Sequence, residues 1–142
     1  MKTISKLSLP ITVLVGLYLL ISGNLFSLNP FLVVQVMAIA VLPWARRSFQ
    51  AGQFNIHADP KGGQLISSGP YKFIRHPMYA SVLVIIWSGI LGHFSLPNLI
   101  LGVVVTVVVA TRILVEEKYL RETYPEYVDF SRKSKLIIPF IL

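Results

Sequence analysis

The stretch of sequence that decides the fold is residues 77–111, PMYASVLVIIWSGILGHFSLPNLILGVVVTVVVAT, which contains 35 residues and no Asp, Glu, Lys or Arg. A helix that crosses a membrane needs about 20 predominantly apolar residues, so this stretch is too long for one span. Residues typical of turns interrupt it at Gly92 and His93 and again at residues 95–98. We therefore predict a helical hairpin with helices at about residues 78–93 and 97–115.

A second uncharged stretch, of 39 residues, covers residues 7–45 and is interrupted at residues 22–24 and 28–30. It predicts another hairpin, with helices at about residues 8–27 and 30–45. The shorter helices have about 16 residues and would be about 24 Å long, which is short for a span. The predicted fold is an all-α integral membrane protein with four transmembrane helices arranged as two hairpins, followed by a C-terminal helix.

The composition agrees with this prediction. The chain has 142 residues, of which 54% are hydrophobic and 13% charged, and its mean hydropathy is +0.69. A soluble domain carries about 25% charged residues, so the composition disfavours a soluble enzyme and excludes a disordered chain. There is no cysteine, which excludes disulfides, thiolate metal sites and a cysteine nucleophile.

The distribution of positive charge predicts the topology. All 13 Lys and Arg residues lie near the N-terminus, in the central segment or in the tail, and none lies in the turns near residues 23–30 and 93–97. The positive-inside rule therefore places both termini and the central segment in the cytoplasm. The first apolar stretch lacks a clear cleavage site, so we expect it to be a helix and not a signal peptide. We expect a bacterial inner-membrane protein whose net charge of +7 faces anionic lipid, with no nucleic-acid partner.

The polar segments at the two ends of the second hairpin carry the functional information. Tyr71, Arg75, His76 and Tyr79 precede or begin the helix predicted at residues 78–93. Considered singly, these residues are typical of interfacial anchors and aromatic belts. Arg112 and Glu116 are four residues apart and share a helix face beyond the end of the neighbouring span, and Glu117 lies beside them. Because a hairpin brings its two ends together, we predict that these groups converge into a functional site at the cytoplasmic surface.

Two motifs give the chain a family resemblance. Residues 69–79 read GPYKFIRHPMY, and residues 112–120 read RILVEEKYL. An aromatic series at Tyr124, Tyr127 and Phe130 and a closing Ile138-Pro139 follow. Over about residues 60–142 the sequence resembles the superfamily of isoprenylcysteine carboxyl methyltransferases and phospholipid methyltransferases. This resemblance implies one membrane methyltransferase domain over residues 1–142, with the first hairpin in residues 1–45 and the catalytic core in residues 46–142.

The resemblance also implies a binding site for S-adenosylmethionine formed by the cytoplasmic loop and the C-terminal segment. Arg112 corresponds to the residue that orients the substrate, and one carboxylate of the pair Glu116 and Glu117 would hold the ribose or amino end of the cofactor. No metal is implied. The residues that would line the cofactor are Gln64, Leu65, Ile66, Tyr71, Arg75, His76, Pro77, Tyr79, Glu116 and Glu117.

The chemistry of methyl transfer suits these residue types. Tyr71 or Tyr79 can stabilise a sulfonium by about 0.5–2 kcal/mol through cation–π attraction. Arg75 or His76 can meet the carboxylate of the cofactor. We predict catalytic roles for Arg112, which would align a carboxylate acceptor, and for His76 or Glu116, either of which would take the proton from an amine acceptor.

The identity of the acceptor stays open between the carboxylate of a prenylated cysteine-like molecule and a lipid amine. Three departures from the family pattern bear on it: Ser81 stands where glycine is common, Tyr124 and Pro125 stand where an aromatic residue and glycine are common, and the closing basic residue is replaced by the cluster RKSK at residues 132–135. Two alternatives from other classes also stay open: a reductase that uses NADPH, of the related sterol reductase type, and a membrane subunit without enzymatic activity.

Overall fold

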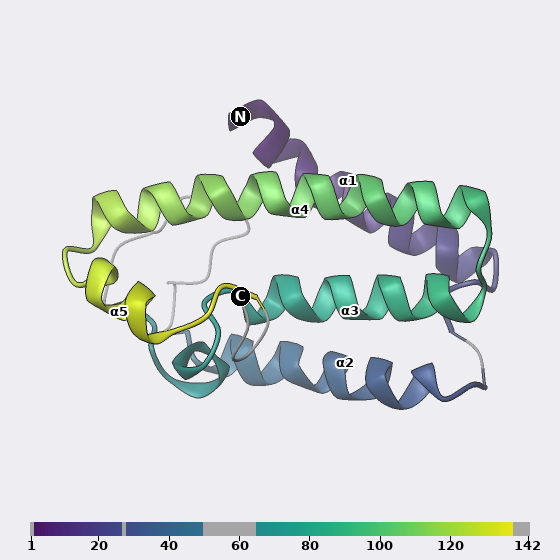
Figure 1. Ribbon diagram of the computed structural model, residues 1–142, viewed down its shortest axis with the longest axis horizontal. Helices are drawn as coiled ribbons and strands as arrows, with labels where there is room; N and C mark the ends of the chain where they lie inside the picture. Colours follow the sequence, from purple (N-terminus) through teal and green to yellow (C-terminus); the bar gives the residue numbers. More distant parts are fainter. Residues whose placement is uncertain (1, 27, 50–64, 138–142) are drawn as a thin grey trace.

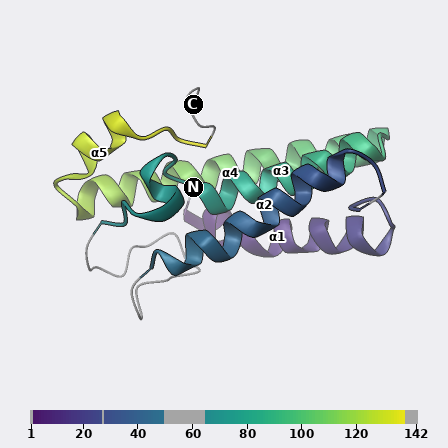
Figure 2. The same cartoon turned by 90° about the horizontal axis from the view of Figure 1, so that it is seen from below.

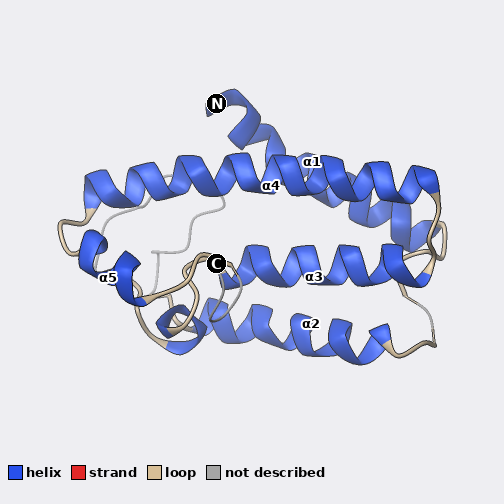
Figure 3. Ribbon diagram, viewed as in Figure 1, coloured by secondary structure: helices blue, strands red, loops and turns tan. Residues whose placement is uncertain are grey.

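The computed structural model describes residues 2–26, 28–49 and 65–137, and every regular element in these ranges is helical (Figure 3). The all-α prediction is thereby confirmed. The elements, in chain order, are α1 (Lys2–Ile21), α2 (Phe31–Arg47), the short 3-10 helix η1 (Gly69–Lys72), α3 (Pro77–Gly92), α4 (Leu96–Thr123) and α5 (Tyr127–Lys133).

The main deviation from the predicted helices is in α1, which was expected at residues 8–27 and runs instead from Lys2 to Ile21, so both its bounds lie six residues earlier than predicted. Gly23 has a φ of 73°, and its amide bonds to the carbonyl of Leu20, so the chain turns out of the helix six residues early. The helices α2 and α3 lie within two residues of their predicted bounds. The fourth helix continues beyond residue 115, as the sequence predicts, and runs unbroken to Thr123.

The four long helices form two antiparallel pairs that lie side by side (Figures 1 and 2). In one pair α1 packs along α4, and in the other α2 packs along α3. The hairpin between α3 and α4 joins the two pairs. Its turn is held by Asn98, whose side chain donates to the carbonyl of His93 and whose amide is capped by Ser95. This turn brings the start of α3 and the C-terminal part of α4 to the same end of the bundle, as expected.

The hydrophobic core lies between α1, α3 and α4. On α4 its members recur every four residues, as expected for one face of a helix. The buried members are Val15, Leu19, Leu25, Ile86, Ile90, Val105, Val109 and Ile113. This core fixes α4 against both of its neighbours and so sets the height at which Arg112, Glu116 and Glu117 emerge.

A buried amide fastens the end of the bundle that lies away from the polar segments. Gln35 on α2 is 1% exposed, and its Nε2 donates to the carbonyls of Leu25 at 2.7 Å and Ile85 at 3.2 Å. Gly89 lets the chain at Leu25 pass closely, because a Cβ at residue 89 would lie 2.7 Å from the Leu25 carbonyl oxygen. The turn after α1 is thereby fixed to α2 and α3.

The outer faces of the helices are strongly apolar. In the described part of the chain α4 alone is long and apolar enough to cross a membrane, and α3 and the Lys6–Ile21 part of α1 are shorter apolar helices. Large apolar side chains stand exposed along the four long helices, among them Leu14, Ile21, Val33, Met37, Val107 and Leu114. A continuous apolar surface of this kind indicates association with a membrane.

Candidate functional site

The 3-10 helix η1 places Tyr71 beside the end of α2. Gly69 begins η1 with a φ of 57°, which favours glycine, and a Cβ there would also force the Ser48 hydroxyl to move. The ring of Phe49 meets that of Tyr71 edge to face, with 5.6 Å between their centroids. The chain that follows α2 therefore helps to orient Tyr71.

The segment before α3 is held by the C-terminal tail. The amides of Arg75 and His76 donate to the carbonyls of Lys135 at 2.7 Å and Leu136 at 3.1 Å. In return the Lys135 amide donates to the carbonyl of Phe73 at 3.0 Å. The tail thus lies alongside the residues that lead into α3, where Pro77 takes a first-turn position of the helix.

Glu117 is the centre of a buried polar cluster. Its Oε1 accepts hydrogen bonds from Arg75 Nε at 3.0 Å, His76 Nε2 at 2.8 Å and the Tyr127 hydroxyl at 2.5 Å. Arg121 lies 3.7 Å from its other oxygen. One carboxylate therefore joins α4, the start of α3 and α5.

Arg75 also links the start of α3 to the C-terminal segment. Its Nε donates to Glu117, and its Nη1 donates to the carbonyls of Ser131 at 2.7 Å and Ser134 at 2.6 Å. The guanidinium thereby fixes the end of α5 and the chain that follows it. These contacts hold the tail against the site.

Glu116 belongs to a separate chain of hydrogen bonds. Its Oε2 accepts from the Tyr79 hydroxyl at 2.7 Å, and that hydroxyl accepts from Arg112 Nε at 2.7 Å. Arg112 is 7% exposed and also lies over the Tyr79 ring, with Cζ 5.7 Å from the centroid. Its Nη1 donates to Ser8 Oγ on α1 at 3.0 Å. Residues of α1, α3 and α4 meet in this chain.

The tyrosines of the site remain protonated at neutral pH. Burial raises the pKa of Tyr71, and the charge of Glu116 raises this pKa further. Burial also raises the pKa of Tyr127, and its hydrogen bond to Glu117 adds to the effect. Each hydroxyl therefore keeps its proton for donation to a carboxylate or to a ligand.

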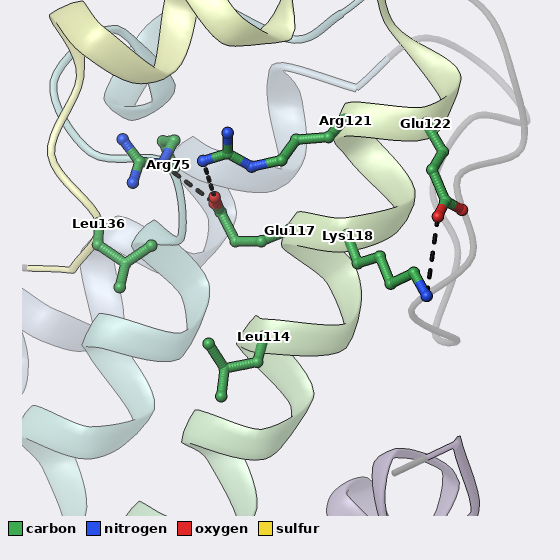
Figure 4. Close-up of a pocket in the computed structure, with 7 residues that line it drawn as sticks. All are labelled: Arg75, Leu114, Glu117, Lys118, Arg121, Glu122 and Leu136. Atoms are coloured by element: carbon green, nitrogen blue, oxygen red, sulfur yellow. Dashed lines mark hydrogen bonds and ion pairs between the residues drawn. The ribbon is translucent and has the colours of Figure 1, made fainter.

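An open groove of about 610 Å³ lies on the Glu117 side of α4 (Figure 4). Leu136 and Arg75 form one side of it, and α4 contributes the other. Apolar Leu114 lies two helical positions before Glu116, and the charged residues follow it toward the end of α4. The residues that line the groove are Arg75, Leu114, Glu117, Lys118, Arg121, Glu122 and Leu136.

Most of the predicted site residues come together. Tyr79 and Arg112 contact Glu116 directly or through one hydroxyl, Arg75 and His76 contact Glu117, and Tyr71 lies within the electrostatic reach of Glu116. Pro77 is buried at the start of α3.

The segment predicted to line the cofactor is less completely placed. Leu65 and Ile66 are half-buried and lie outside the helices. Among the hydrogen bonds of the described residues, none joins these two residues to Glu116 or Glu117. Gln64, predicted with them, lies outside the described residues, as do Ile138 and Pro139.

Three residues of the site were missed by the sequence reasoning. Tyr127 was recognised as part of an aromatic series, but its bond to Glu117 was not predicted. Phe49 and Ser8 carried no motif, and their contacts depend on how the first hairpin packs against the second. Among residues 2–26, 28–49 and 65–137, no group of three or more His, Asp or Glu side chains could hold a metal ion.

The sequence match to known families agrees with this site. The chain belongs to the phospholipid methyltransferase family, which it matches over residues 11–127. The family resemblance noted from the two motifs is thereby confirmed, and it extends into the first hairpin. The family indicates methyltransferase activity in general, in a protein associated with membranes.

Comparison with individual proteins is less informative. The chain is 26% identical over 80 residues to the cobalt-zinc-cadmium resistance protein CzcN of Cupriavidus metallidurans, over 56% of this chain and 37% of that protein. The chain thus spans little more than a third of the length of the curated relative it matches. No solved structure matches it significantly.

Proposed function

We propose that the chain is a methyltransferase that uses S-adenosylmethionine and acts on a lipidic acceptor at the cytoplasmic face of the membrane. The observation that carries this proposal is the placement of the Glu116 carboxylate, which accepts a hydrogen bond from the Tyr79 hydroxyl at 2.7 Å at the end of the bundle that also holds Tyr71. A carboxylate near tyrosine side chains suits an organic cation, since its negative charge and an open ring face both attract the cation.

The residues present fit the cofactor. S-adenosylmethionine would supply an activated methyl group, which leaves a sulfonium for an oxygen or nitrogen of the acceptor. Tyr71 offers a ring face for the sulfonium. The Tyr79 ring already has His76 stacked on it, with 5.6 Å between centroids, and Arg112 Cζ over it at 5.7 Å, so Tyr79 contributes through its hydroxyl. Arg75 remains the proposed donor to the cofactor carboxylate, because a His76 ring that donates through Nε2 to Glu117 has no second N–H to give.

The two glutamates take different parts in this proposal. Oε1 of Glu117 already accepts three hydrogen bonds from the protein, whereas Glu116 is half-buried and accepts one from Tyr79. We therefore assign contact with the ribose hydroxyls or the ammonium group to Glu116. Glu117 orients His76 by accepting from its Nε2, which leaves Nδ1 as the basic nitrogen of the ring.

The acceptor would be oriented by Arg112. A carboxylate acceptor is ionised at neutral pH and needs only alignment, which a guanidinium provides through two parallel hydrogen bonds. A lipid amine must lose a proton, and His76 or Glu116 is the proposed base. In either case the chain would act on molecules held in the surrounding bilayer.

The proposed arrangement in the membrane follows the charges. Four helices would cross or enter the bilayer as two hairpins, with both termini and the candidate site on the cytoplasmic side of a bacterial inner membrane. The support is that the C-terminal ends of α2 and α4, together with α5, lie at one end of the bundle (Figure 1), and these elements carry Arg46 and Arg47, the charges from Arg112 to Glu122, and Arg132 and Lys133.

Titration calorimetry with the detergent-solubilised protein tests the proposal. We expect S-adenosylmethionine to bind with a Kd in the micromolar range and NADPH to give no heat of binding. A second arm incubates radiolabelled S-adenosylmethionine with the protein and a total membrane lipid extract, and identifies the labelled lipid. A folded sample that binds NADPH instead indicates a reductase, and one that binds neither ligand indicates a subunit without enzymatic activity.

A further inference from the structure

Ser8 is a buried hydroxyl on the first helix that reaches the centre of the site. It is 1% exposed, and its Oγ accepts a hydrogen bond from Arg112 Nη1 at 3.0 Å across 104 positions of sequence. Ser8 lies outside both motifs and before the first residue of the family match. Nothing in the sequence pattern assigns it a role.

The position of Ser8 on α1 is specific. Ser8, Val15 and Leu19 are seven and four residues apart, so they share one face of the helix, and Val15 and Leu19 belong to the core. The flanking residues Leu7 and Leu9 are 51% and 43% exposed. A small polar residue therefore stands on the buried face of α1, at the level of Arg112, while leucines on either side point outward.

Acceptors on two different helices help to orient the Arg112 guanidinium. Nε donates to the Tyr79 hydroxyl at 2.7 Å, and Nη1 donates to Ser8 at 3.0 Å. Because all the nitrogens of a guanidinium lie in one plane and donate within it, two such bonds restrict the rotation of that plane. Tyr79 supplies one of these contacts from α3, and Ser8 supplies another from α1.

We propose that Ser8 is a positioning residue that sets the plane of Arg112 and thereby the orientation in which the acceptor's anionic group is bound. This inference rests on the proposed function, in which Arg112 orients the acceptor. Planar, bidentate recognition depends on the direction of the guanidinium, so a change in that direction weakens acceptor binding. The first hairpin then contributes to the active site as well as to the scaffold.

The experiment compares three serine variants in the full chain. Ser8→Ala removes the acceptor oxygen, and Ser8→Thr keeps it. Ser88→Ala is the matched control, because Ser88 is also a buried helical serine but bonds only to the carbonyls of Val84 and Ile85 in its own helix. The probes are S-adenosylmethionine in calorimetry, and vesicles of phosphatidylethanolamine or a micellar farnesyl thioether carboxylate in the transfer assay.

We expect Ser8→Ala to raise the KM for the acceptor about tenfold, because a buried charged donor loses its partner. The Kd for S-adenosylmethionine should stay within about twofold of the wild-type value, since the proposed cofactor contacts do not include Ser8. Ser8→Thr should restore much of the acceptor affinity, and Ser88→Ala should leave both constants unchanged.

Three results would overturn the proposal: wild-type kinetics for Ser8→Ala, an equal loss of cofactor and acceptor binding, or no recovery in Ser8→Thr. Failure of the proposed function is seen separately, because it would be evident in the wild-type protein as an absence of cofactor binding. The Ser8–Arg112 contact is then tested by melting temperatures of Ser8→Ala, Arg112→Lys and the double variant. Additive shifts would show that the two residues do not interact.

Discussion

Glu116 and Glu117 are neighbours in sequence but have different partners, because successive residues on a helix point about 100° apart. Glu116 is turned toward Tyr79 and Arg112, and Glu117 toward Arg75, His76 and Tyr127. The pair therefore separates two tasks, with one carboxylate available for a ligand and the other used to hold the protein together.

This separation predicts opposite effects of the two amide substitutions. Glu116→Gln should raise the Kd for S-adenosylmethionine about tenfold and change the melting temperature little, because it removes the charge that attracts the cofactor. Glu117→Gln should lower the free energy of unfolding by about 3 kcal/mol, since it leaves Arg75 without its ion-pair partner. Calorimetry and thermal unfolding measure the two quantities. Glu122→Gln, at an exposed position of the same helix, is the control and should change neither the Kd nor the free energy of unfolding. A larger effect of Glu117→Gln on cofactor binding than on stability would contradict the assignment.

The Tyr79 hydroxyl links the proposed acceptor and cofactor residues. Tyr79→Phe keeps the ring but removes the oxygen that accepts from Arg112 and donates to Glu116. We expect kcat/KM for methyl transfer to fall by about 10- to 100-fold, because Arg112 loses one of its hydrogen-bond acceptors. The Kd for the cofactor should rise less, since the Glu116 carboxylate remains. Equal losses in both measurements would show that the hydroxyl acts in cofactor binding alone.

The sequence predicted the neighbourhood of these side chains better than their partners. Arg75, His76, Arg112 and Glu117 were expected to converge because a hairpin brings its ends together. That Arg75 would bond to the carbonyls of Ser131 and Ser134 could not be foreseen, since a backbone carbonyl has no signature in the sequence. Ser8 was missed for a related reason: one serine in an apolar helix shows nothing of the face on which it will lie.

Among the elements, α5 and the tail have an importance out of proportion to their length. α5 has seven residues, yet Tyr127 is 1% exposed and bonds to Glu117. The chain after α5 then pairs with the residues that lead into α3. The site is therefore enclosed by a segment that is anchored at Tyr127 and again at Lys135.

Loss of the first anchor should destabilise this enclosure. Tyr127→Phe removes a buried hydrogen bond to a carboxylate, so we expect the free energy of unfolding to fall by about 2 kcal/mol. Proteolysis of the native protein should cut the tail faster, as followed by mass spectrometry. Tyr18→Phe is the control, because Tyr18 is 52% exposed on α1. Tail cleavage at the wild-type rate in Tyr127→Phe would argue against an anchoring role.

The turn into η1 should be sensitive to any side chain. Gly69→Ala puts a Cβ at a φ of 57° and against Ser48, so we expect a loss of about 2 kcal/mol of stability. Gly16→Ala is a favourable control, since a Cβ there meets nothing within 4 Å and alanine favours a helix by about 1 kcal/mol. Thermal unfolding of the two variants should shift in opposite directions, and equal shifts would contradict the requirement for glycine at residue 69.

Helix positions were predictable to within a residue or two wherever proline or a capping residue marks the start, as at Pro77 and Ser95. The end of α1 was placed six residues too far along, because the apolar run LF after the break looked like a continuation of the helix. The left-handed turn at Gly23 ends the helix there. Apolar residues continue past such a turn, so the hydropathy of the sequence does not show which residue is the last of the helix.

At the scale of the whole molecule, polar contacts and apolar surface lie in different regions. The candidate site occupies one end of the bundle, and exposed apolar side chains cover the length of the helices. Leu28, which is 100% exposed, lies in the turn between α1 and α2 at the other end. The proposed topology therefore places the two ends of the bundle on opposite sides of a membrane.

Single-cysteine labelling tests that topology directly, because the chain has no native cysteine. In inverted membrane vesicles, where the cytoplasmic side faces outward, a membrane-impermeant maleimide should label Lys118→Cys at once. It should label Leu28→Cys only after detergent is added. Both positions are exposed, so access to the reagent is the sole difference. Labelling of both cysteines in sealed vesicles would rule out the two-hairpin arrangement.

The pairing of the tail with the chain before α3 has a consequence for biosynthesis. All four long helices have been translated once Thr123 is added, but the amides of Arg75 and His76 find their partners only when residues 135 and 136 have been translated as well. A message cut short between these points would yield a polypeptide that has all four long helices but an incomplete candidate site. Premature stop codons late in the reading frame are therefore expected to be as damaging as early ones.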